Sequence, residues 1–266
     1  MRSDDLAERT LTQLGFEVEK LPVSTVSGKK MPDFLVRYGT SSALVEAKLK
    51  GDDPDEASLR AETLEAGEVY VSDHAPGRDE TLSGIVRQGE KQLKAGAGIE
   101  SDFNVLLVLV DCINAQVVSE QFVDTLYGRT TVIEYGKALQ VKPCYFYRNS
   151  DFYRRREIDA AIVGHVHVQR GNASLRICLN PYSPRYRELK VSGFLLPFDR
   201  AVLDPIEEEK AGRAYIPDDN VERKEQAFTR TFPLYDPVLH HLAEKYQTGR
   251  LVRGDFNAPE FAVRSR

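Results

Sequence analysis

Two acidic residues and a lysine lie at the ends of two apolar segments that read as one β-hairpin. Asp33 stands at the start of the first segment, and Glu46 and Lys48 stand at the far end of the second. The break between them, residues 39–42, reads Gly-Thr-Ser-Ser, which is typical of a turn. Because side chains alternate along a strand, Glu46 and Lys48 must point to the same side.

The register of the hairpin decides whether Asp33 joins them. If the turn pairs Tyr38 with Ala43, Asp33 lies opposite Lys48, and directly opposed residues share a face. A slip of one residue would turn Asp33 to the other face. In the simplest register, the sequence therefore predicts that two carboxylates and an ammonium group converge at the open end of the hairpin.

This combination of groups is suited to a metal site with a charged neighbour. Magnesium binds hard oxygen ligands and usually takes one or two carboxylates from the protein. We expect Mg²⁺, or Mn²⁺, to be held by Asp33, Glu46 and the backbone carbonyl of Ala47, while Lys48 orients a nucleophilic water. The alternative is a solvated strand face with an ordinary Glu-x-Lys pair. Apolar residues on both sides of the strand favour burial, and buried charges need a partner.

The motif resembles that of a known enzyme superfamily. Pro32-Asp33, then twelve residues, then Glu46-Ala47-Lys48 is similar to the motif of the PD-(D/E)XK nucleases, which include restriction endonucleases, archaeal-type resolvases and repair nucleases. A helix that ends in residues 14–18, Leu-Gly-Phe-Glu-Val, precedes the motif, as in the Mrr-like and Holliday-resolvase-like members. The resemblance covers roughly residues 3 to 111. It implies catalytic roles for Asp33, Glu46 and Lys48.

The resemblance also implies further residues at the site. An acid from the first helix often completes it, and Asp4 and Glu8 are the candidates because they lie four residues apart on one face. The spacing from the end of this helix favours Asp4. A glutamine or lysine on the following helix often holds water or phosphate. Gln88 and Gln92 share a face there, and we favour Gln88 because Leu93 indicates packing next to Gln92.

A second candidate feature is a run of cations beside aromatic residues. Arg154, Arg155 and Arg156 follow Phe152 and Tyr153, a composition suited to phosphate contact and base stacking. Core aromatic residues next to a basic loop are the alternative explanation. The net charge of −5 is unusual for a nucleic-acid-binding protein, but a net charge says nothing about local patches.

Other sites receive less support. His165 and His167 have strand spacing, and a His-x-His pair needs further ligands to hold zinc. The chain has no GxxxxGK[ST], GxGxxG or GxSxG sequence. Its three cysteines, widely separated, form no CxxC pair. The longest aliphatic run, six residues from Val105 to Val110, is too short to span a membrane, and the first residues lack the pattern of a signal peptide. We therefore expect a cytoplasmic protein.

The pattern of elements predicts an α/β (α+β) fold with a mixed, restriction-endonuclease-like sheet flanked by helices. The first half reads α-β-β-β-α-β, so residues 1–141 form the expected nuclease-like core and residues 142–266 a strand-rich extension packed on it. Further expected elements are a helix over 79–95, a buried strand over 104–110, helical patterns over 117–139 around a break at Gly128, strands over 143–147, 158–168, 175–179 and 193–198, and a helix over 237–246.

These features lead to one main hypothesis and two rivals. The main hypothesis is a metal-dependent DNA endonuclease that acts in defence or repair, with a homodimer or protein partner as a further expectation. The first rival is a catalytically silent module of the same fold that binds protein or nucleic acid. The intact set Asp33, Glu46 and Lys48 argues against silence. The second rival is an RNA nuclease, with DNA favoured over RNA.

Overall fold

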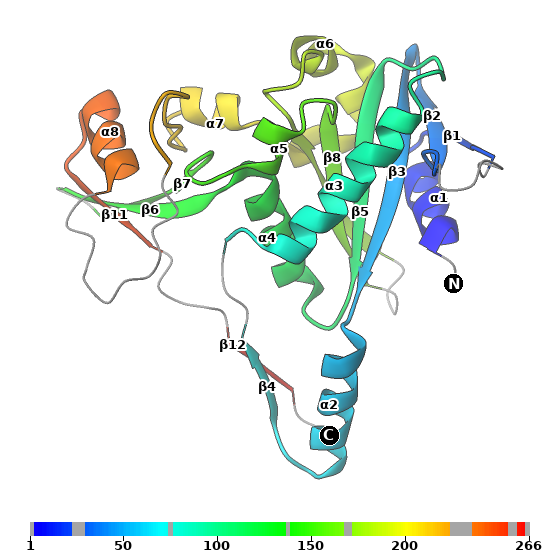
Figure 1. The fold of residues 1–266 in the computed structure, drawn as a ribbon, viewed down its shortest axis with the longest axis horizontal. Coiled ribbons are helices and arrows are strands. Elements are labelled where there is room, and N and C mark those ends of the chain that lie inside the picture. The colour runs from blue at the N-terminus through cyan, green and yellow to red at the C-terminus, as the bar shows by residue number, and fades with distance from the viewer. Residues whose placement is uncertain are drawn as a thin grey trace.

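The chain folds around a mixed β-sheet of seven strands in the order β1-β2-β3-β5-β8-β9-β10 (Figure 1). The computed structural model describes residues 3–22, 30–73, 77–136, 139–167, 172–223, 236–254 and 260–263. None of the helices in these ranges is long and apolar enough to cross a membrane. The sheet strands are β1 (Glu17–Lys20), β2 (Phe34–Tyr38), β3 (Ser41–Gly51), β5 (Phe103–Asp111), β8 (Ala160–His167), β9 (Asn172–Leu179) and β10 (Val202–Leu203).

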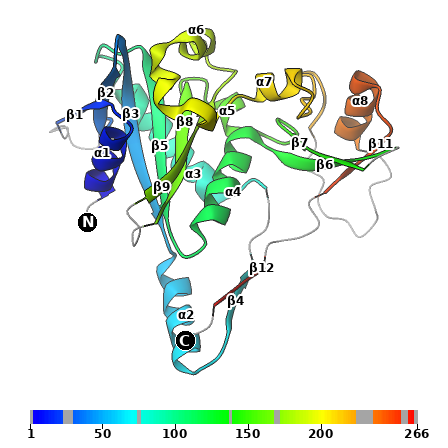
Figure 2. The same cartoon turned by 180° about the vertical axis from the view of Figure 1, so that it is seen from behind.

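Helices cover both faces of this sheet (Figures 1 and 2). On one face α3 (Glu80–Ala95) and α4 (Ala115–Tyr127) pack on the side chains of Leu44, Leu106 and Val108. On the other face α1 (Ser3–Gln13), α6 (Tyr186–Val191) and the 3₁₀ segment η1 (Gly193–Ala201) pack on the alternate residues of the same strands. The strands β3, β5 and β8 run parallel at the centre and are buried on both sides, which explains the nearly continuous aliphatic sequence of β5.

The hairpin of β2 and β3 has a tighter turn than the sequence suggested. Tyr38 pairs with Ser41 rather than with Ala43, so the loop is only Gly39-Thr40, with Gly39 at φ 58°. Two-residue loops of this kind match the twist of the strands. Ser42 is drawn into β3 because its N–H and hydroxyl both bond Asp102, at 2.7 and 2.9 Å. The register shifts by two residues, an even number, and every side chain keeps its predicted face.

Residues beyond 141 complete the same sheet. The strands β8, β9 and β10 extend it from β5, and the expected boundary at residue 141 falls within β7 (Gln140–Cys144). β7 pairs with β6 (Thr130–Tyr135), which also pairs with β11 (Arg250–Arg253). Helix α8 (Pro237–Tyr246) packs on this smaller sheet through Val238 and Leu242. The remaining short helices are α5 (Asp151–Arg154) and α7 (Pro205–Lys210).

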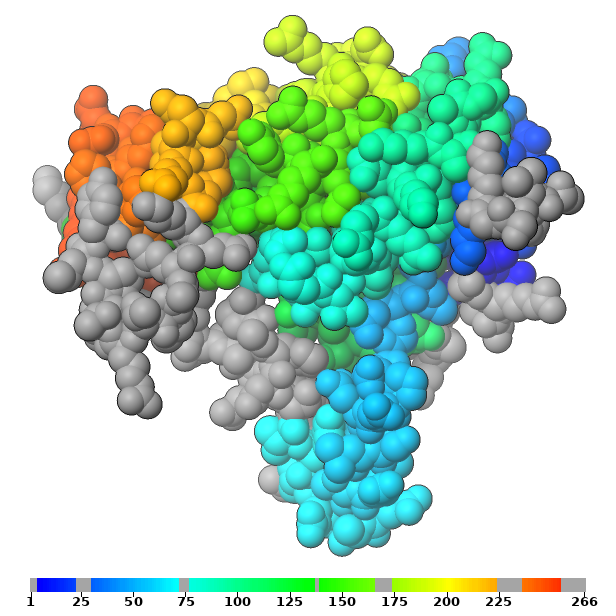
Figure 3. Space-filling model, viewed as in Figure 1, coloured from blue at the N-terminus to red at the C-terminus, as the bar shows by residue number. Residues whose placement is uncertain are grey.

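An arm projects from this body (Figures 1 and 3). It consists of α2 (Pro54–Glu65) and β4 (Tyr70–Asp73), which lie between β3 and α3 in the chain, and of β12 (Glu260–Val263), which pairs with β4. Helix α2 has no buried residue. Asp53 caps its first turn by accepting hydrogen bonds from the N–H groups of Asp55 and Glu56.

Three of the expected elements differ in the structure. The segment 193–198 is 3₁₀-helical rather than extended: Phe194 and Phe198 are buried while Leu196 is 69% exposed, whereas a strand would place all three on one face. The predicted break at Gly128 is where α4 ends, but the residues after it, expected to be helical, form the β-branched strand β6. The predicted strand over 143–147 ends at Cys144, and Phe146 adopts φ 58°.

The close approach of Gly128 to the backbone of Arg148 can be tested by substitution. It ends α4 at φ 57°, and a Cβ there would lie 2.4 Å from the carbonyl oxygen of Arg148. Because neither backbone segment can move freely, we expect Gly128→Ala to lower the free energy of unfolding by about 2 kcal/mol or more. Gly212→Ala is the matched control, with φ 71° but open space, and should cost about 1 kcal/mol. Equal losses in urea denaturation would contradict the close-contact explanation.

Candidate functional site

Asp33 is held at the point where the β2–β3 ladder ends. The last regular pair is Phe34 with Val45, and the Asp33 N–H donates to the carbonyl of Val45 at 3.1 Å. The carboxylate then takes the place of a backbone acceptor, because Asp33 Oδ2 accepts from the N–H of Ala47 at 2.9 Å. The Asp33 carboxylate is thereby held beside Glu46 and Ala47, which follow Val45 in β3.

Glu46 and Lys48 lie on the face of β3 that α3 covers. Glu46 is fully buried, and its Oε1 accepts from Lys48 Nζ at 2.5 Å. Lys48 Nζ also donates to Gln92 Oε1 at 2.6 Å, and the lysine side chain remains 19% exposed. The second oxygen of the glutamate, Oε2, is buried and has no hydrogen-bond partner in the described parts of the chain.

The electrostatics of the two acids reflect this burial. Burial raises the pKa of Glu46 to about 7; Lys48 opposes the shift, and the neighbouring charge of Asp33 adds to it. Burial also raises the pKa of Asp33, against the lowering effects of the Ala47 N–H and of Lys48. The site therefore holds more negative charge than its single ammonium group balances. A cation bound there would relieve this imbalance.

Helix α3 comes close enough to β3 to complete the site because it carries a glycine at the contact. A Cβ on Gly89 would lie 2.5 Å from Leu106 Cδ1 and 3.8 Å from Glu46 Cγ. Gln92, one turn further along, is buried against Lys48. Gln88 is exposed, so the structure brings Gln92 to the site rather than the residue that the sequence favoured. An internal glycine in a helical pattern was the sequence signal for this close approach.

The two candidate acids of α1 differ in their relation to the site. Asp4 pairs with Lys20 at 3.1 Å, and its charge contributes to the raised pKa of Asp33. Lys20 in turn pairs in the sheet with Phe34, next to Asp33. Glu8 is exposed. The charge of Asp4 therefore acts on Asp33, while its side chain pairs with Lys20.

The three consecutive arginines have different environments. Arg155 is 15% exposed and forms ion pairs with Glu90 of α3 at 3.1 Å and with Asp151 at 3.0 Å. Arg154 and Arg156 are exposed. Arg155 therefore joins α5 to α3, and its neighbours remain on the surface. His165 is half-buried in β8, and the side chain of His167 lies outside the described residues.

The donor set at Asp33 and Glu46 fits a small, hard cation. Two carboxylates converge there, and the orphaned Glu46 Oε2 is a buried acceptor that a cation would satisfy. In the described residues, no group of three or more His, Cys, Asp and Glu side chains could hold a metal. A metal at this site must therefore complete its coordination with backbone oxygen, water or substrate, which Mg²⁺ commonly does.

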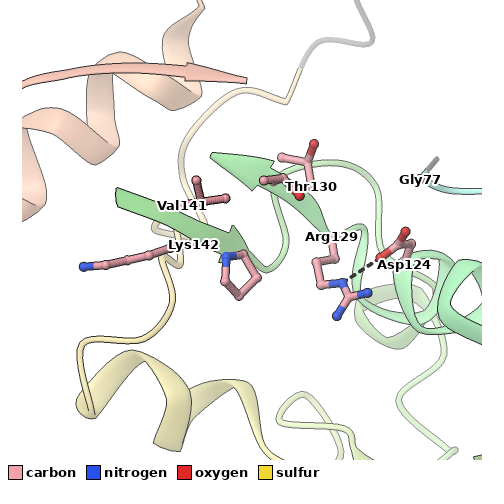
Figure 4. A pocket seen from close by; sticks show the side chains of 8 residues that line it. Gly77, Asp124, Arg129, Thr130, Val141 and Lys142 are labelled. Carbon is pink, nitrogen blue, oxygen red and sulfur yellow. Dashed lines mark hydrogen bonds and ion pairs between the residues drawn. The ribbon is translucent and has the colours of Figure 1, made fainter. Parts of the chain in front are cut away.

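A separate cavity of about 310 Å³ lies between α4 and the β6–β7 hairpin (Figure 4). The guanidinium of Arg129 lines it and is paired with Asp124 at 2.6 Å and with Glu120 at 2.9 Å. Lys142 Nζ lies 5.2 Å from the ring centroid of Tyr215. The Arg129 and Asp124 charges are thus paired with each other, Lys142 lies over an aromatic ring, and we assign the cavity no ligand.

The raised pKa of Glu46 predicts a characteristic pH dependence of stability. Because its pKa is higher in the folded chain, about 7 against an ordinary 4.5, the folded state binds this proton more tightly, and the stabilisation is lost as pH rises through 7. We expect Glu46→Gln to be more stable than the wild type at pH 8, by on the order of 3 kcal/mol, with the difference shrinking toward pH 4.5. Urea denaturation across this range measures it. An exposed control, Glu65→Gln, should show no such trend, and a pH-independent difference for Glu46→Gln would contradict the prediction.

The two glutamines of α3 provide a second test. We expect Gln92→Ala to lower the free energy of unfolding by about 1–3 kcal/mol, because the partly buried Lys48 ammonium loses an acceptor. Gln88→Ala, one turn away and exposed, should change it by less than about 0.5 kcal/mol. Chemical denaturation of both variants at pH 7 compares them directly. Similar values for the two would mean that the Gln92 contact contributes little to stability.

No family model matches the chain, no curated protein matches it, and no solved structure matches it.

Proposed function

We propose that this chain is a metal-dependent nuclease that hydrolyses phosphodiester bonds, with a restriction-endonuclease-like core of the PD-(D/E)XK type. The observation that carries the proposal is the convergence of Asp33, Glu46 and Lys48 at the open end of the β2–β3 hairpin. One glutamate oxygen there is buried and has no hydrogen-bond partner in the described part of the chain. DNA is the substrate that the sequence resemblance implies.

The order of helices and strands supports the proposal of a restriction-endonuclease-like core. A helix, a three-stranded antiparallel unit, a helix and a parallel strand follow one another as α1, β1–β3, α3 and β5. The motif residues lie on β3 and directly before β2, next to the parallel strand β5. The arm of α2 and β4 is inserted between β3 and α3 and projects from the body that holds the sheet (Figure 1).

Each residue of the site has a role that its environment supports. Asp33 and Glu46 would hold Mg²⁺ or Mn²⁺ together with the carbonyl of Ala47. A bound cation supplies charge neutralisation at the phosphate and lowers the pKa of water. Lys48 spends two of its three N–H groups on Glu46 and Gln92, which leaves one for a water or a phosphate oxygen.

Hydrogen bonds from neighbouring groups keep Asp33 and Lys48 in place. Gln92 holds the Lys48 ammonium from the helix side, while the Ala47 N–H holds Asp33 from the strand side. Since α3 and β3 pack directly, rotation of either group away from the site would break a partly buried hydrogen bond. Asp4, through its charge, tunes the pKa of Asp33 and need not bind metal itself.

Cleavage and metal binding can be tested separately. We expect the wild type to cut plasmid, linear or single-stranded DNA with Mg²⁺ or Mn²⁺, and Asp33→Asn and Lys48→Met to lose at least 100-fold in rate. We also expect Mn²⁺ to raise the melting temperature of the wild type and of Lys48→Met but not of Asp33→Asn. Glu56→Gln, an exposed acid on α2, is the control for both measurements.

The outcomes discriminate between the rival hypotheses. If no DNA or RNA substrate is cut and no metal changes the melting temperature, the nuclease proposal is wrong and the silent binding module takes its place. Cleavage of RNA alone would favour the RNA nuclease. Metal-induced stabilisation of Asp33→Asn equal to that of the wild type would place the metal elsewhere.

A further inference from the structure

The outer face of α3 and the adjoining α5 form a positively charged surface in a chain of net charge −5. The Arg155–Glu90 ion pair joins the two elements at 3.1 Å, and both lie on the face seen in Figures 1 and 3. We call this region the basic surface. Its exposed cations are Arg87, Lys91 and Lys94 on α3 and Arg154 and Arg156 at α5.

The acid at the centre of the basic surface is already neutralised. Glu90 is 12% exposed and pairs with both Arg155 and Lys94, the latter at 2.9 Å. Arg154 and Arg156 have no ion pair with the described residues, in contrast to Arg155 between them. The exposed acid Glu157 follows Arg156 in the chain. The surface thus keeps an excess of positive charge that faces solvent.

Aromatic rings border these cations. Tyr153 is 44% exposed, and its ring meets that of Tyr182 edge to face, with centroids 4.9 Å apart. The Arg156 guanidinium lies 5.3 Å from the Tyr153 centroid and 5.8 Å from that of Tyr182. Tyr182 is further oriented by a hydrogen bond to Asp219 at 3.0 Å. A rigid aromatic platform with a planar cation beside it is therefore exposed at α5.

We propose that the basic surface binds single-stranded nucleic acid, with its cations on the phosphates and Tyr153 stacked on an unpaired base. Exposed aromatic rings beside a cationic track are the features by which proteins hold single strands, because every base offers a flat face once it is unstacked. A continuous duplex keeps its bases stacked and offers none to the ring. The cations alone would fit any nucleic acid. The exposed aromatic ring is the reason for proposing a single strand.

The basic surface and the candidate catalytic site lie on opposite sides of one helix. Gly89 and Gln92 face β3, whereas Arg87, Lys91 and Lys94 face solvent. A helix is roughly 10 Å across, so a strand crossing α3 would reach the site within a few nucleotides. The inference deepens the proposed nuclease function and rests on it for this relation between binding and cleavage.

The test is a binding measurement that does not require catalysis. The full chain in EDTA is titrated with fluorescein-labelled dT₂₀ and with a 20-base-pair duplex, at several salt concentrations. We expect Tyr153→Ala to weaken dT₂₀ binding about tenfold. We expect Arg154→Gln/Arg156→Gln to weaken it and to reduce the slope of log affinity against log salt by about 1.4. The matched control, Arg187→Gln/Arg200→Gln, removes two exposed arginines from α6 and η1 on the opposite face of the sheet.

The outcomes separate this inference from the nuclease proposal. Selective loss of dT₂₀ binding in the α5 variants supports the basic surface, whether or not the chain cuts DNA. Failure of the wild type to bind dT₂₀, equal effects in the control, or unchanged affinity in Tyr153→Ala would overturn it. Preserved binding together with absent cleavage would count against the catalytic proposal alone.

Discussion

The burial of the Glu46 carboxyl group beneath α3 is the constraint on which the rest of the site depends. An ionised side chain with no exposed surface is costly unless it is paired or coordinated. Lys48 provides one partner, and Gln92 and the backbone hold the neighbouring groups. One glutamate oxygen is still left without a hydrogen-bond partner among the residues that the structure describes. Such an arrangement costs stability at neutral pH, and a cation bound there, as we propose, would offset that cost.

Helix α3 connects this site with the rest of the molecule. Its inner face needs Gly89 to approach Leu106, and its outer face is tied to α5 by the Arg155–Glu90 ion pair. The C-terminal half of the chain therefore supplies three strands of the central sheet. It also supplies α5 and Arg155, which are joined to α3 by an ion pair and a hydrogen bond. One helix thereby links the acids of the hairpin to the cations and rings at α5.

Much of the fold follows from local sequence patterns, and the exceptions have identifiable causes. The buried strand β5, helix α3 and helix α8 were predictable because their apolar residues recur with one clear period. The segment 193–198 was misread because Phe194, Leu196 and Phe198 satisfy a strand pattern, yet only the two phenylalanines find partners in the core. The sequence predicted a hairpin loop that is two residues too long. The hydrogen bond from the Ser42 N–H to Asp102, which holds Ser42 in β3, comes from a residue 60 positions away in the chain.

The sequence by itself determined that Asp33, Glu46 and Lys48 share a face. This depends on the period of two in a strand, and it survives a two-residue error in register. Only the tertiary structure decided that Gln92 rather than Gln88 contacts Lys48, and that Arg155 is paired while Arg154 and Arg156 are exposed. Neighbouring residues of the same type differ only in the direction from which another element packs. That direction is set by contacts between distant segments, which no local pattern contains.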